Sequence, residues 1–502
     1  MSILGKSAAA NQQMQEVFGE LQTLVEEAVK GGHPIHQVEQ NLWQQLMQLG
    51  RCCLGQFLSL HGDGDMGPTI AVEDQEWHRF AEHHQRRYVS IFGVFELQRV
   101  VYGSREGQKI EFVPLDNRLQ LPDSAYSYML QDWTQGLSVE SAFRQVSTMV
   151  QRMFGLKVPV DSLERMNGRM AELVEDYRMD RATPAPETEG ELAVASADGK
   201  GIVMRRSADD PAPAAHRSKG EKASQKQMAT VASVYTVDRY VRTAEEVVAA
   251  LFRDEEKKPP PRPRPKNKRV WASLGRVEAG EKISGIDVVH EEMMNELVKR
   301  NRREQAWVRP MVFLYDGQES LWEGRRRHLP GLGIDVLDLL HVTPRLWQAA
   351  HVFHAENSDE AEAFVRERCL RVLQGRSEGV VRGLREMATK RGLNAASKRT
   401  IAQICGYFEK NRDKMRYDQY LAAGYPIASG VIEGACRHLV KDRMERAGMH
   451  WTPSGAQAML DVRSVHIDGD WAKYQAYRIE RETRMLYPHR KLVEGASYKL
   501  AC

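Results

Sequence analysis

Met311-Val312-Phe313-Leu314-Tyr315-Asp316-Gly317 is the stretch of this chain that decides its fold. Five consecutive apolar residues followed by a glycine turn predict a short strand that is buried on both faces. A strand of that kind lies centrally in a sheet, so Asp316 would hold a carboxylate at the end of a central strand. Asp-Gly after a strand is also an ordinary turn signal, and that interpretation stays open for Asp316.

The segments upstream of this stretch predict the rest of the sheet. Residues 192–196, 229–237 and 269–274 are strand-like, and a charged amphipathic helix is expected over 281–303. The order strand, strand, strand, helix, strand is typical of a mixed sheet flanked by helices. Asp198 lies at the end of the first of these strands, so it is a second candidate for a carboxylate at the sheet.

Other stretches interrupt or follow the sheet pattern. Residues 205–226 are polar and charged, and residues 257–269 are proline-rich and basic, so we expect disordered loops in both places. Residues 333–337 are again strand-like. From Leu346 to about Ala423 the apolar spacing predicts helices throughout.

The N-terminal part has a different character. Two apolar helical runs in the first sixty residues, separated by Gly31-Gly32, predict either an intramolecular hairpin or a dimer seam. Alternating residues at 95–102, followed by a strand-like stretch at 110–114, predict a small β module. Over 122–180, a helix opening at Gly136-Leu137-Ser138 and another near Asp161 have the outline of a helix-turn-helix, and an ordinary helical hairpin fits equally well.

Composition excludes several classes of protein. The 502 residues contain 71 Lys and Arg against 68 Asp and Glu, so the net charge is only +3. Six cysteines without a Cys-x-x-Cys pattern argue against a disulfide framework and against structural zinc. No run approaches about 18 apolar residues, and polar Asn11-Gln12-Gln13 stand where a signal peptide would need its apolar core. We therefore expect a cytoplasmic protein without a membrane partner.

Three acidic residues form the candidate site. Glu433 lies in Ser429-Gly430-Val431-Ile432-Glu433-Gly434, in the first turn of a helix that Ser429 could cap. With Asp198 and Asp316 it would supply the oxygen ligands that Mg²⁺ prefers, and phosphoryl transfer on nucleic acid uses two such ions about 4 Å apart. Taken singly, Asp198 fits a turn and Glu433 fits a solvated acid at a helix start.

Several phrases resemble a known group of proteins. The surroundings of Asp198, the stretch 313–317, and above all Gly430-Val431-Ile432-Glu433-Gly434-Ala435-Cys436-Arg437, with Lys441-Asp442-Arg443-Met444 and Gly448-Met449-His450-Trp451, are similar to bacterial insertion-sequence transposases of the DDE type, closest to the ISKra family. The resemblance implies a ribonuclease-H-like catalytic core with an all-helical insertion between the second aspartate and the glutamate. It also implies that Asp198, Asp316 and Glu433 are catalytic and bind two Mg²⁺ or Mn²⁺ ions.

The resemblance further implies an activity and its partners. The enzyme would cleave DNA at the terminal inverted repeats of its element and join the freed 3′-hydroxyl to target DNA, acting as a homo-oligomer on DNA in the bacterial cytoplasm and nucleoid. Two alternatives stay open: a structure-specific nuclease without strand transfer, and a non-catalytic DNA-binding protein derived from a transposase.

The predicted fold class is a multidomain α+β and α/β protein with this core. The predicted segments are an N-terminal helical region (1–85), a small β module (86–121), a helix-turn-helix-like DNA-binding region (122–185), the first part of the catalytic core (186–345), a helical insertion (346–425), the second part of the core with the Glu433 helix (426–465) and a C-terminal tail (466–502).

Histidines near the second aspartate add candidates. Asp338-Leu339-Leu340-His341 resembles the Asp-x-x-His signature of related transposases with helical insertions, which implies an auxiliary role for Asp338 and His341 near the active site. A local cap or packing role for His341 stays open. His351 and His354 lack further ligands, so a surface helix is the better interpretation for them.

Basic residues predict contacts to DNA. Arg437 and Lys441 stand four and eight residues after Glu433, on one face of a helix, where they would follow the DNA backbone into the site. A plain ion pair between Lys441 and Glu445 is the alternative. The full set of predicted contacts is Arg437, Lys441, Arg443, Lys200, Arg325 and Arg326.

Three basic clusters and four tryptophans complete the prediction. The clusters at 257–269, 299–303 and 325–328 would form local patches for backbone phosphate. Trp271, Trp322, Trp347 and Trp451 could stack on frayed bases, although a core position fits most of them better.

Overall fold

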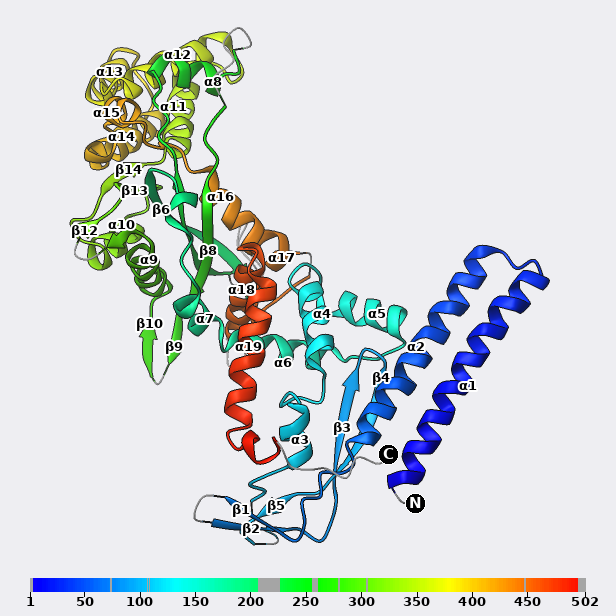
Figure 1. Cartoon of the computed structure of the whole chain (residues 1–502). Helices are drawn as coiled ribbons and strands as arrows, with labels where there is room; N and C mark the ends of the chain where they lie inside the picture. Colours follow the sequence, from blue (N-terminus) through cyan, green and yellow to red (C-terminus); the bar gives the residue numbers. More distant parts are fainter. Residues whose placement is uncertain are drawn as a thin grey trace, which may run out of the picture. The chain divides into compact units, whose positions relative to one another are not determined.

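The computed structural model describes residues 3–494 except 73–74, 106, 108, 206–225, 255–260, 279, 304–305 and 447. The chain divides into two compact units (Figure 1), one formed by Met1–Leu173 with Trp471–Cys502 and the other by Val174–Asp470. In the part of the chain that the structure describes, no helix combines the length and the apolar character needed to cross a membrane.

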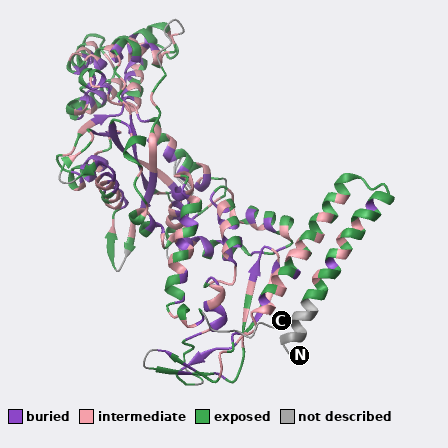
Figure 2. Ribbon diagram, in the orientation of Figure 1, coloured by how far each residue is buried: buried purple, intermediate pink, exposed green. Residues whose placement is uncertain are grey.

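The first unit begins with a helical hairpin. α1 (Ile3–Lys30) and α2 (Ile35–Leu60) pack against each other across a short turn in which Gly32 adopts a φ of 59°. Val17 and Ala28 are buried, and the predicted hairpin is confirmed. Most other side chains of both helices remain exposed or half-buried (Figure 2).

Two small β structures follow, and they begin earlier than predicted. β1 (Thr69–Val72), β2 (Gln75–Arg79) and β5 (Tyr102–Gly103) form one sheet, and β3 (His84–Ser90) pairs with β4 (Gly93–Arg99). The predicted strand at 110–114 is wrong, because Pro114 begins the short helix α3 (Pro114–Leu119) and Phe112 forms an isolated bridge to Tyr102.

A group of helices completes the first unit. They are α4 (Tyr128–Ser138), α5 (Phe143–Phe154), α6 (Val160–Ala171), α19 (Trp471–Leu486) and η4 (Arg490–Leu492). The predicted helix start at Gly136 is wrong, because Ser127 caps α4 and residues 136–138 are its last turn. The second predicted start, near Asp161, is confirmed by α6. The segment predicted as a tail contains α19, whose Tyr474 hydroxyl donates to the carbonyl of Met170 on α6.

A five-stranded mixed sheet organises the second unit. Its order is β14-β13-β6-β7-β8; β6, β7 and β8 are antiparallel, whereas β13 and β14 run parallel to β6. The bounds are β6 (Leu192–Val203), β7 (Lys226–Val237), β8 (Lys266–Leu274), β13 (Met311–Tyr315) and β14 (Ile334–Leu337). The predicted strands are therefore confirmed, with a mixed sheet as expected.

Two predictions next to the sheet need correction. The loop predicted at 257–269 is wrong over 266–269, because these residues pair with β7 as the start of β8; residues 206–225 and 257–260 lie outside the described residues. The helix predicted over 281–303 is shorter, since residues 281–283 form a strand that pairs with its neighbour. The elements are β9 (Arg276–Glu278), β10 (Glu281–Ile283), α9 (Gly285–Asn301), β11 (Arg302–Arg303) and β12 (Ala306–Trp307).

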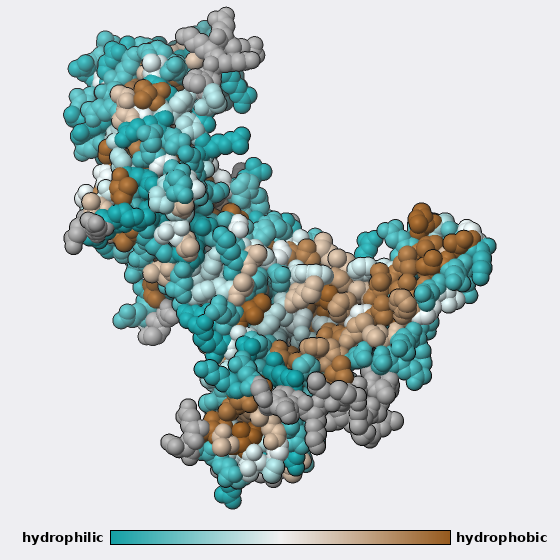
Figure 3. All heavy atoms as spheres, viewed as in Figure 1, coloured by the Kyte–Doolittle hydropathy of each residue, from teal (hydrophilic) through white to brown (hydrophobic). Residues whose placement is uncertain are grey.

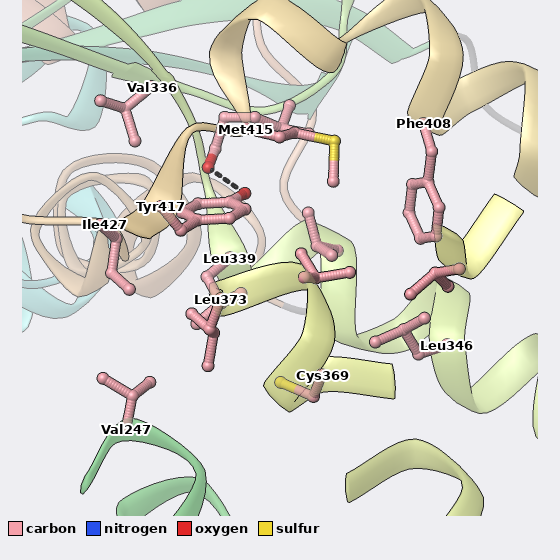
Figure 4. Close-up of a cluster of buried hydrophobic side chains, with 14 of the residues drawn as sticks. Val247, Val336, Leu339, Leu346, Cys369, Leu373, Phe408, Met415, Tyr417 and Ile427 are labelled. Atoms are coloured by element: carbon pink, nitrogen blue, oxygen red, sulfur yellow. Dashed lines mark hydrogen bonds between the residues drawn. The ribbon is translucent and has the colours of Figure 1, made fainter. Parts of the chain in front are cut away.

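Helices cover both faces of the sheet. On one face, Phe313 and Tyr315 pack against α9 and α10 (Glu319–His328). On the other face, Val312 and Leu314 belong to a larger core formed with α8 (Ala244–Leu251) and the helical block. The helical block consists of α11 (Leu339–Phe353), α12 (Asp359–Leu373), α13 (Ser377–Lys390), α14 (Ala395–Lys410), η2 (Arg412–Lys414) and α15 (Tyr417–Ala422). Figure 4 shows Tyr417 within this core, with a hydrogen bond of its hydroxyl drawn as a dashed line. The covered faces explain the uninterrupted apolar run of β13.

The remaining elements of the second unit come from the beginning and the end of the chain segment 174–470. They are α7 (Val174–Asp180), η1 (Pro186–Thr188), α16 (Gly430–Ala435), the π-helical stretch η3 (Cys436–Lys441), α17 (Asp442–Met444) and α18 (Pro453–Ile467). The predicted helical block is confirmed, although it begins at Leu339 and not at Leu346, because Asp338 caps α11.

Candidate active site

Three aspartates share one level on three neighbouring parallel strands. Asp316 and Asp338 directly follow β13 and β14, whereas the prediction that Asp198 ends a strand is wrong, because β6 pairs with β7 as far as Val203 and Asp198 lies in its middle. Phe313 pairs with Ala195, and Asp316 and Asp198 each lie three residues further along their strands. Tyr315 pairs with Leu337, and Asp316 and Asp338 each lie one residue further. Because residues in register on parallel strands point to the same face, the sheet itself brings these carboxylates together.

The helix α16 brings Glu433 to this group. Ser429 caps α16 by accepting from the backbone of Ile432, and its hydroxyl lies 3.5 Å from that of Ser196, two residues before Asp198 on β6. Cys436, at the other end of α16, donates its thiol to Oδ2 of Asp198 at 3.5 Å. α16 is thus fixed to β6 on both sides of Glu433, and the predicted capping by Ser429 is confirmed.

Asp338 and His341 complete the acidic centre, which we define as Asp198, Asp316, Asp338, His341 and Glu433. Asp338 is buried, caps α11 by accepting from the backbone of Leu340 at 2.9 Å, and lies 3.5 Å from Nδ1 of His341. Among the described residues, the group whose ligand atoms lie within 4.8 Å of one another is Asp338, His341 and Glu433. Asp198 and Asp316 are close enough to influence the charges of this group, but are not part of it.

The charges in the acidic centre repel one another. Burial raises the pKa of Asp316, and the neighbouring carboxylates Asp198 and Asp338 raise it further. Burial and then Asp338 likewise raise the pKa of Glu433. His341 responds in the opposite sense, because the carboxylate of Asp338, 3.5 Å from Nδ1, raises the pKa of the imidazole. A bound cation would relieve this repulsion, so the donor set of four carboxylates and one imidazole fits a hard divalent ion.

Backbone groups fix two of the aspartates. The amide of Gly199 donates to Oδ1 of Asp198 at 2.6 Å, and the amide of Gln318 donates to Oδ1 of Asp316 at 2.8 Å. The carbonyl of Asp316 accepts from the indole of Trp322 at 2.8 Å. These bonds hold the carboxylates on rigid elements, which is the requirement for a pre-formed site.

Two residues of the helical block, Tyr407 beside Gly317 and Arg345 over the Tyr407 ring, were not predicted. A Cβ atom on Gly317 would overlap the ring of Tyr407 on α14, so this glycine is required for the close approach of that ring. Arg345 of α11 is exposed and lies over the same ring, 5.1 Å from its centroid. A pattern search could not single out either residue, because both are ordinary members of amphipathic helices.

The six predicted DNA contacts fall into three pairs. Arg437 and Lys441 are exposed, and Arg437 lies 3.7 Å from Asp442. Arg443 and Arg325 do not fit the prediction, because both are buried: Arg443 lies 5.0 Å from the ring centroid of Trp451, and Arg325 stacks on Phe313 and pairs with Asp335.

The remaining two predicted contacts have carboxylate partners. Arg326 is exposed and pairs with Glu319 at 2.6 Å, and Lys200 lies 3.7 Å from Glu445. Glu445 also pairs with Lys226 at 2.9 Å. The alternative partner proposed for Lys441 is therefore occupied by lysines from β6 and β7.

The basic clusters are also largely neutralised. In the 299–303 cluster, Arg300 is buried against Glu189 and Glu296, and Lys299 donates to two backbone carbonyls. In the 325–328 cluster, Arg327 and His328 both contact Asp287. These residues therefore stabilise the fold and do not form the expected free patches.

The remaining aromatic and histidine candidates have structural roles. Trp271, Trp322 and Trp451 are buried and Trp347 is half-buried, so the core interpretation is confirmed for these tryptophans. His351 lies exposed on α11, as the surface-helix interpretation predicted.

Comparisons with known proteins leave the identity of the chain open. No protein-family model matches it, and no curated protein matches it. Among solved structures it is similar to the Drosophila P element transposase strand transfer complex, with a TM-score of 0.24 and 9% identity over 74% of this chain and 88% of that chain. Likeness at this level establishes neither a shared fold nor a shared activity.

Proposed function

We propose that this protein is a DDE-type transposase that cleaves and joins DNA at the ends of an insertion sequence. The observation that carries the proposal is the register of β6 and β13, which places Asp198 and Asp316 side by side beneath the helix that carries Glu433. Two strand-borne carboxylates and one helix-borne carboxylate on rigid elements are the arrangement that metal-dependent phosphoryl transfer needs.

The architecture around the acidic centre supports the same proposal. A mixed five-stranded sheet with helices on both faces is compatible with the ribonuclease-H-like core that the sequence resemblance implies. The helical block lies in the chain between Asp316 and Glu433, where the resemblance places an all-helical insertion.

Asp198, Asp316 and Glu433 would hold two Mg²⁺ or Mn²⁺ ions, with Asp338 and His341 beside them. Bound ions would supply positive charge that stabilises the attacking and leaving oxygens of a phosphodiester. The chain itself positions the ligands: Gly199 and Gln318 orient the aspartates, and Cys436 holds the second oxygen of Asp198. His341 can hold a proton on its ring because Asp338 raises its pKa, and it could then donate to a phosphate oxygen.

DNA is the proposed partner, as terminal inverted repeats and as target, with a homo-oligomer assembled on it. Arg437 and Lys441 follow Glu433 on the surface, and Arg345 lies over the ring of Tyr407, which packs on Gly317 next to Asp316. We expect these three to contact backbone phosphate and omit the buried Arg443 and Arg325 from that role. Residues 122–185, which include α4 to α6, stay the candidate for recognising the repeat, with α6 as the second helix of the predicted helix-turn-helix.

The experiment measures metal binding and chemistry separately. Two quantities are measured for the wild type, Asp198→Asn, Asp316→Asn and Glu433→Gln. Calorimetry gives the Mn²⁺ affinity, and a cleavage assay uses DNA that carries the inverted repeats flanking the coding region. Each variant should lose about 10³-fold or more in cleavage rate, because several kcal/mol of charge stabilisation are removed. Glu409→Gln, an exposed acid of α14 paired with Arg385, is the matched control and should behave as the wild type.

The outcomes separate the alternatives. Joined strand-transfer products identify a transposase, whereas cleavage without joining identifies a nuclease. Full cleavage by Glu433→Gln would contradict the assignment of that residue. Specific binding without any cleavage by the wild type would indicate a DNA-binding protein that has lost its activity.

A further inference from the structure

Two separate stretches of the second unit bring arginines to the same end of the sheet. Residues 238–242 leave the end of β7, and residues 261–265 lead into β8, which pairs with β7. Burial lowers the pKa of Arg242, and the charge of Arg262 lowers it further, so the two guanidinium groups lie close to each other. We define the arginine surface as Arg239, Arg242, Arg262 and Arg264.

The arginines of the first stretch are oriented by the chain that follows α15. Arg239 donates to the carbonyl of Ala423 at 2.7 Å, and its guanidinium lies 5.5 Å from the ring centroid of Tyr425. Arg242 donates to the carbonyl of Tyr425 at 3.2 Å and lies 5.0 Å from the ring centroid of Tyr240. Carbonyl groups and aromatic rings hold a guanidinium in place without cancelling its charge.

The second stretch, Pro261-Arg262-Pro263-Arg264-Pro265, is stiff because of its composition. A proline fixes its own φ at about −65°, and each of the two arginines precedes a proline, which disfavours helical backbone at that arginine. The stretch is therefore extended, at about 3.1 Å per residue. Both of its arginines are exposed, and the stiff backbone presents them to a partner at little cost in conformational entropy.

No carboxylate pairs with the arginine surface in the part of the chain that the structure describes. The acids at this end of the sheet have other partners: Asp238 pairs with Lys266 at 2.8 Å, and Glu246 belongs to the capping box of α8. Glu191 accepts from the backbone amide of Arg239 at 2.9 Å and not from its guanidinium. The positive charges of the surface thus remain available to an external anion.

The arginine surface lies at the end of the sheet opposite to the acidic centre. Asp198 pairs with Val231 of β7, and β7 continues from there to Val237, after which the first stretch begins. At about 3.3 Å per residue, this part of the strand spans roughly 20 Å. Between the two sites the helical block packs on Leu192 and Val194. The arginine surface therefore faces a different stretch of solvent from the acidic centre.

The partner that fits this surface is a polyanion with regularly spaced charges. Figure 3 shows hydrophilic residues over most of the helical block on the face in view, whereas a lasting protein interface has an apolar core. Guanidinium groups bind phosphate oxygens bidentately, and duplex DNA carries about one negative charge per 1.7 Å of its axis.

We propose that the arginine surface binds the phosphate backbone of duplex DNA outside the acidic centre. The inference rests on the proposed function in that DNA is the partner, and it adds a second contact area remote from the bond that is cleaved. Binding at this surface requires neither a metal ion nor catalysis.

Fluorescence anisotropy with a duplex of random sequence, without divalent metal and at several salt concentrations, tests the proposal. Arg262→Ala with Arg264→Ala should weaken binding about tenfold at low salt and flatten the slope of log K against log salt by about two units, since each phosphate contact contributes about 0.9 unit. Arg385→Ala with Arg412→Ala is the matched control, because these exposed arginines of the same unit are paired with glutamates, and it should stay close to the wild type. Thermal melting shows whether each variant is folded.

Two further measurements identify the partner and separate this surface from catalysis. Poly-L-glutamate at equal charge concentration should displace the labelled duplex at least about tenfold less well than unlabelled DNA, because its charge density is lower. In the Asp198→Asn background the two arginine substitutions should remove the same two units of slope, so a failure of the cleavage assay does not affect this test. An unchanged slope in Arg262→Ala with Arg264→Ala, an equal loss in the control, or displacement by poly-L-glutamate as effective as by DNA would each overturn the proposal.

Discussion

Two glutamates on one segment, Glu433 and Glu445, should respond in opposite directions to the same substitution. The pKa of Glu433 is raised by burial and by Asp338, so its charge destabilises the folded protein. Burial alone would also raise the pKa of Glu445, but Lys226 and Lys200 outweigh it and lower that pKa. Neutralising Glu433 should therefore stabilise the metal-free protein, and neutralising Glu445 should destabilise it.

The magnitudes follow from distance and exposure. Ligand atoms of Glu433 and Asp338 lie within 4.8 Å of each other, and two unit charges at that separation repel by about 1 kcal/mol in a water-like dielectric. The water-like figure applies because Glu433 is only partly removed from solvent: the residue is largely exposed, and burial of the rest of its carboxyl group raises its pKa. Glu433→Gln should thus gain about 1 kcal/mol, or roughly 2–4 °C in melting temperature. Glu445→Gln should lose about 1 kcal/mol, since it breaks two surface ion pairs worth about 0.2–1 kcal/mol each.

The dependence on pH has a definite sign. A carboxyl group with a raised folded-state pKa begins to destabilise the protein as pH rises above its ordinary value near 4.5, so the advantage of Glu433→Gln should be absent below that pH. His341 offsets part of the repulsion while it is protonated. The advantage should therefore grow further as pH rises through the raised pKa of His341.

Calorimetry and chemical denaturation, each with and without Mn²⁺, are the measurements. Metal at about one hundred times its dissociation constant should stabilise the wild type by roughly 2.7 kcal/mol, and Glu445→Gln by a similar amount. Glu433→Gln should gain less from the metal although it starts from a higher stability. If Glu433→Gln destabilises the metal-free protein, or if Mn²⁺ stabilises it as much as the wild type, the electrostatic account of the acidic centre is refuted.

Three further predictions concern the surroundings of the site. Gly317→Ala should destabilise the protein by about 1–3 kcal/mol through overlap with the Tyr407 ring, and Tyr407→Ala should relieve most of that loss in a double-mutant cycle measured by denaturation. Burial lowers the pKa of His290 to about 4, so stability should fall as pH drops from 6.5 towards 4, by about 1.4 kcal/mol per pH unit, and this slope should flatten in His290→Gln when unfolding is followed at several pH values. Arg437→Ala should reduce the salt dependence of DNA binding by about one unit of slope, whereas Arg443→Met should change the melting temperature and leave that slope unchanged, because the guanidinium is buried.

Much of the fold could be predicted because its signals are local. The apolar run of β13 and the helical spacing after Leu346 each depend on contiguous residues, and Ser429 is a cap that the sequence shows directly. Pairing within the sheet could not be predicted in this way. The register that aligns Asp198 with Asp316 and Asp338 depends on contacts between strands far apart in the chain.

The roles of the arginines could not be predicted for the same reason. Arg325 lies in a basic run, and only folding brings Asp335 and Phe313 to it. The stretch after Glu433 was predicted as a regular α-helix, but it contains the π-helical η3, whose wider turn shifts the later residues around the axis. The prediction from runs of basic residues therefore gave more exposed, unpaired basic side chains near the site than the structure shows.

The helical block contributes to the geometry of the acidic centre, because it is hydrogen-bonded to the sheet next to Asp338. β14 is an edge strand, and the hydroxyls of Tyr420 and Tyr417 on α15 donate to the carbonyls of Asp335 and Leu337 at 3.1 Å and 2.7 Å. The last helix of the block thus supplies hydrogen-bond donors to carbonyl groups of β14, the edge strand that Asp338 directly follows. The chain then passes Ile427, whose carbonyl accepts from the amide of Leu339 at 2.9 Å, so the block leaves and returns at one point of the sheet. Because Glu433 follows that return by only a few residues, the packing of the block sets where Glu433 meets Asp338, and loosening its core should disperse the carboxylates before it unfolds the sheet.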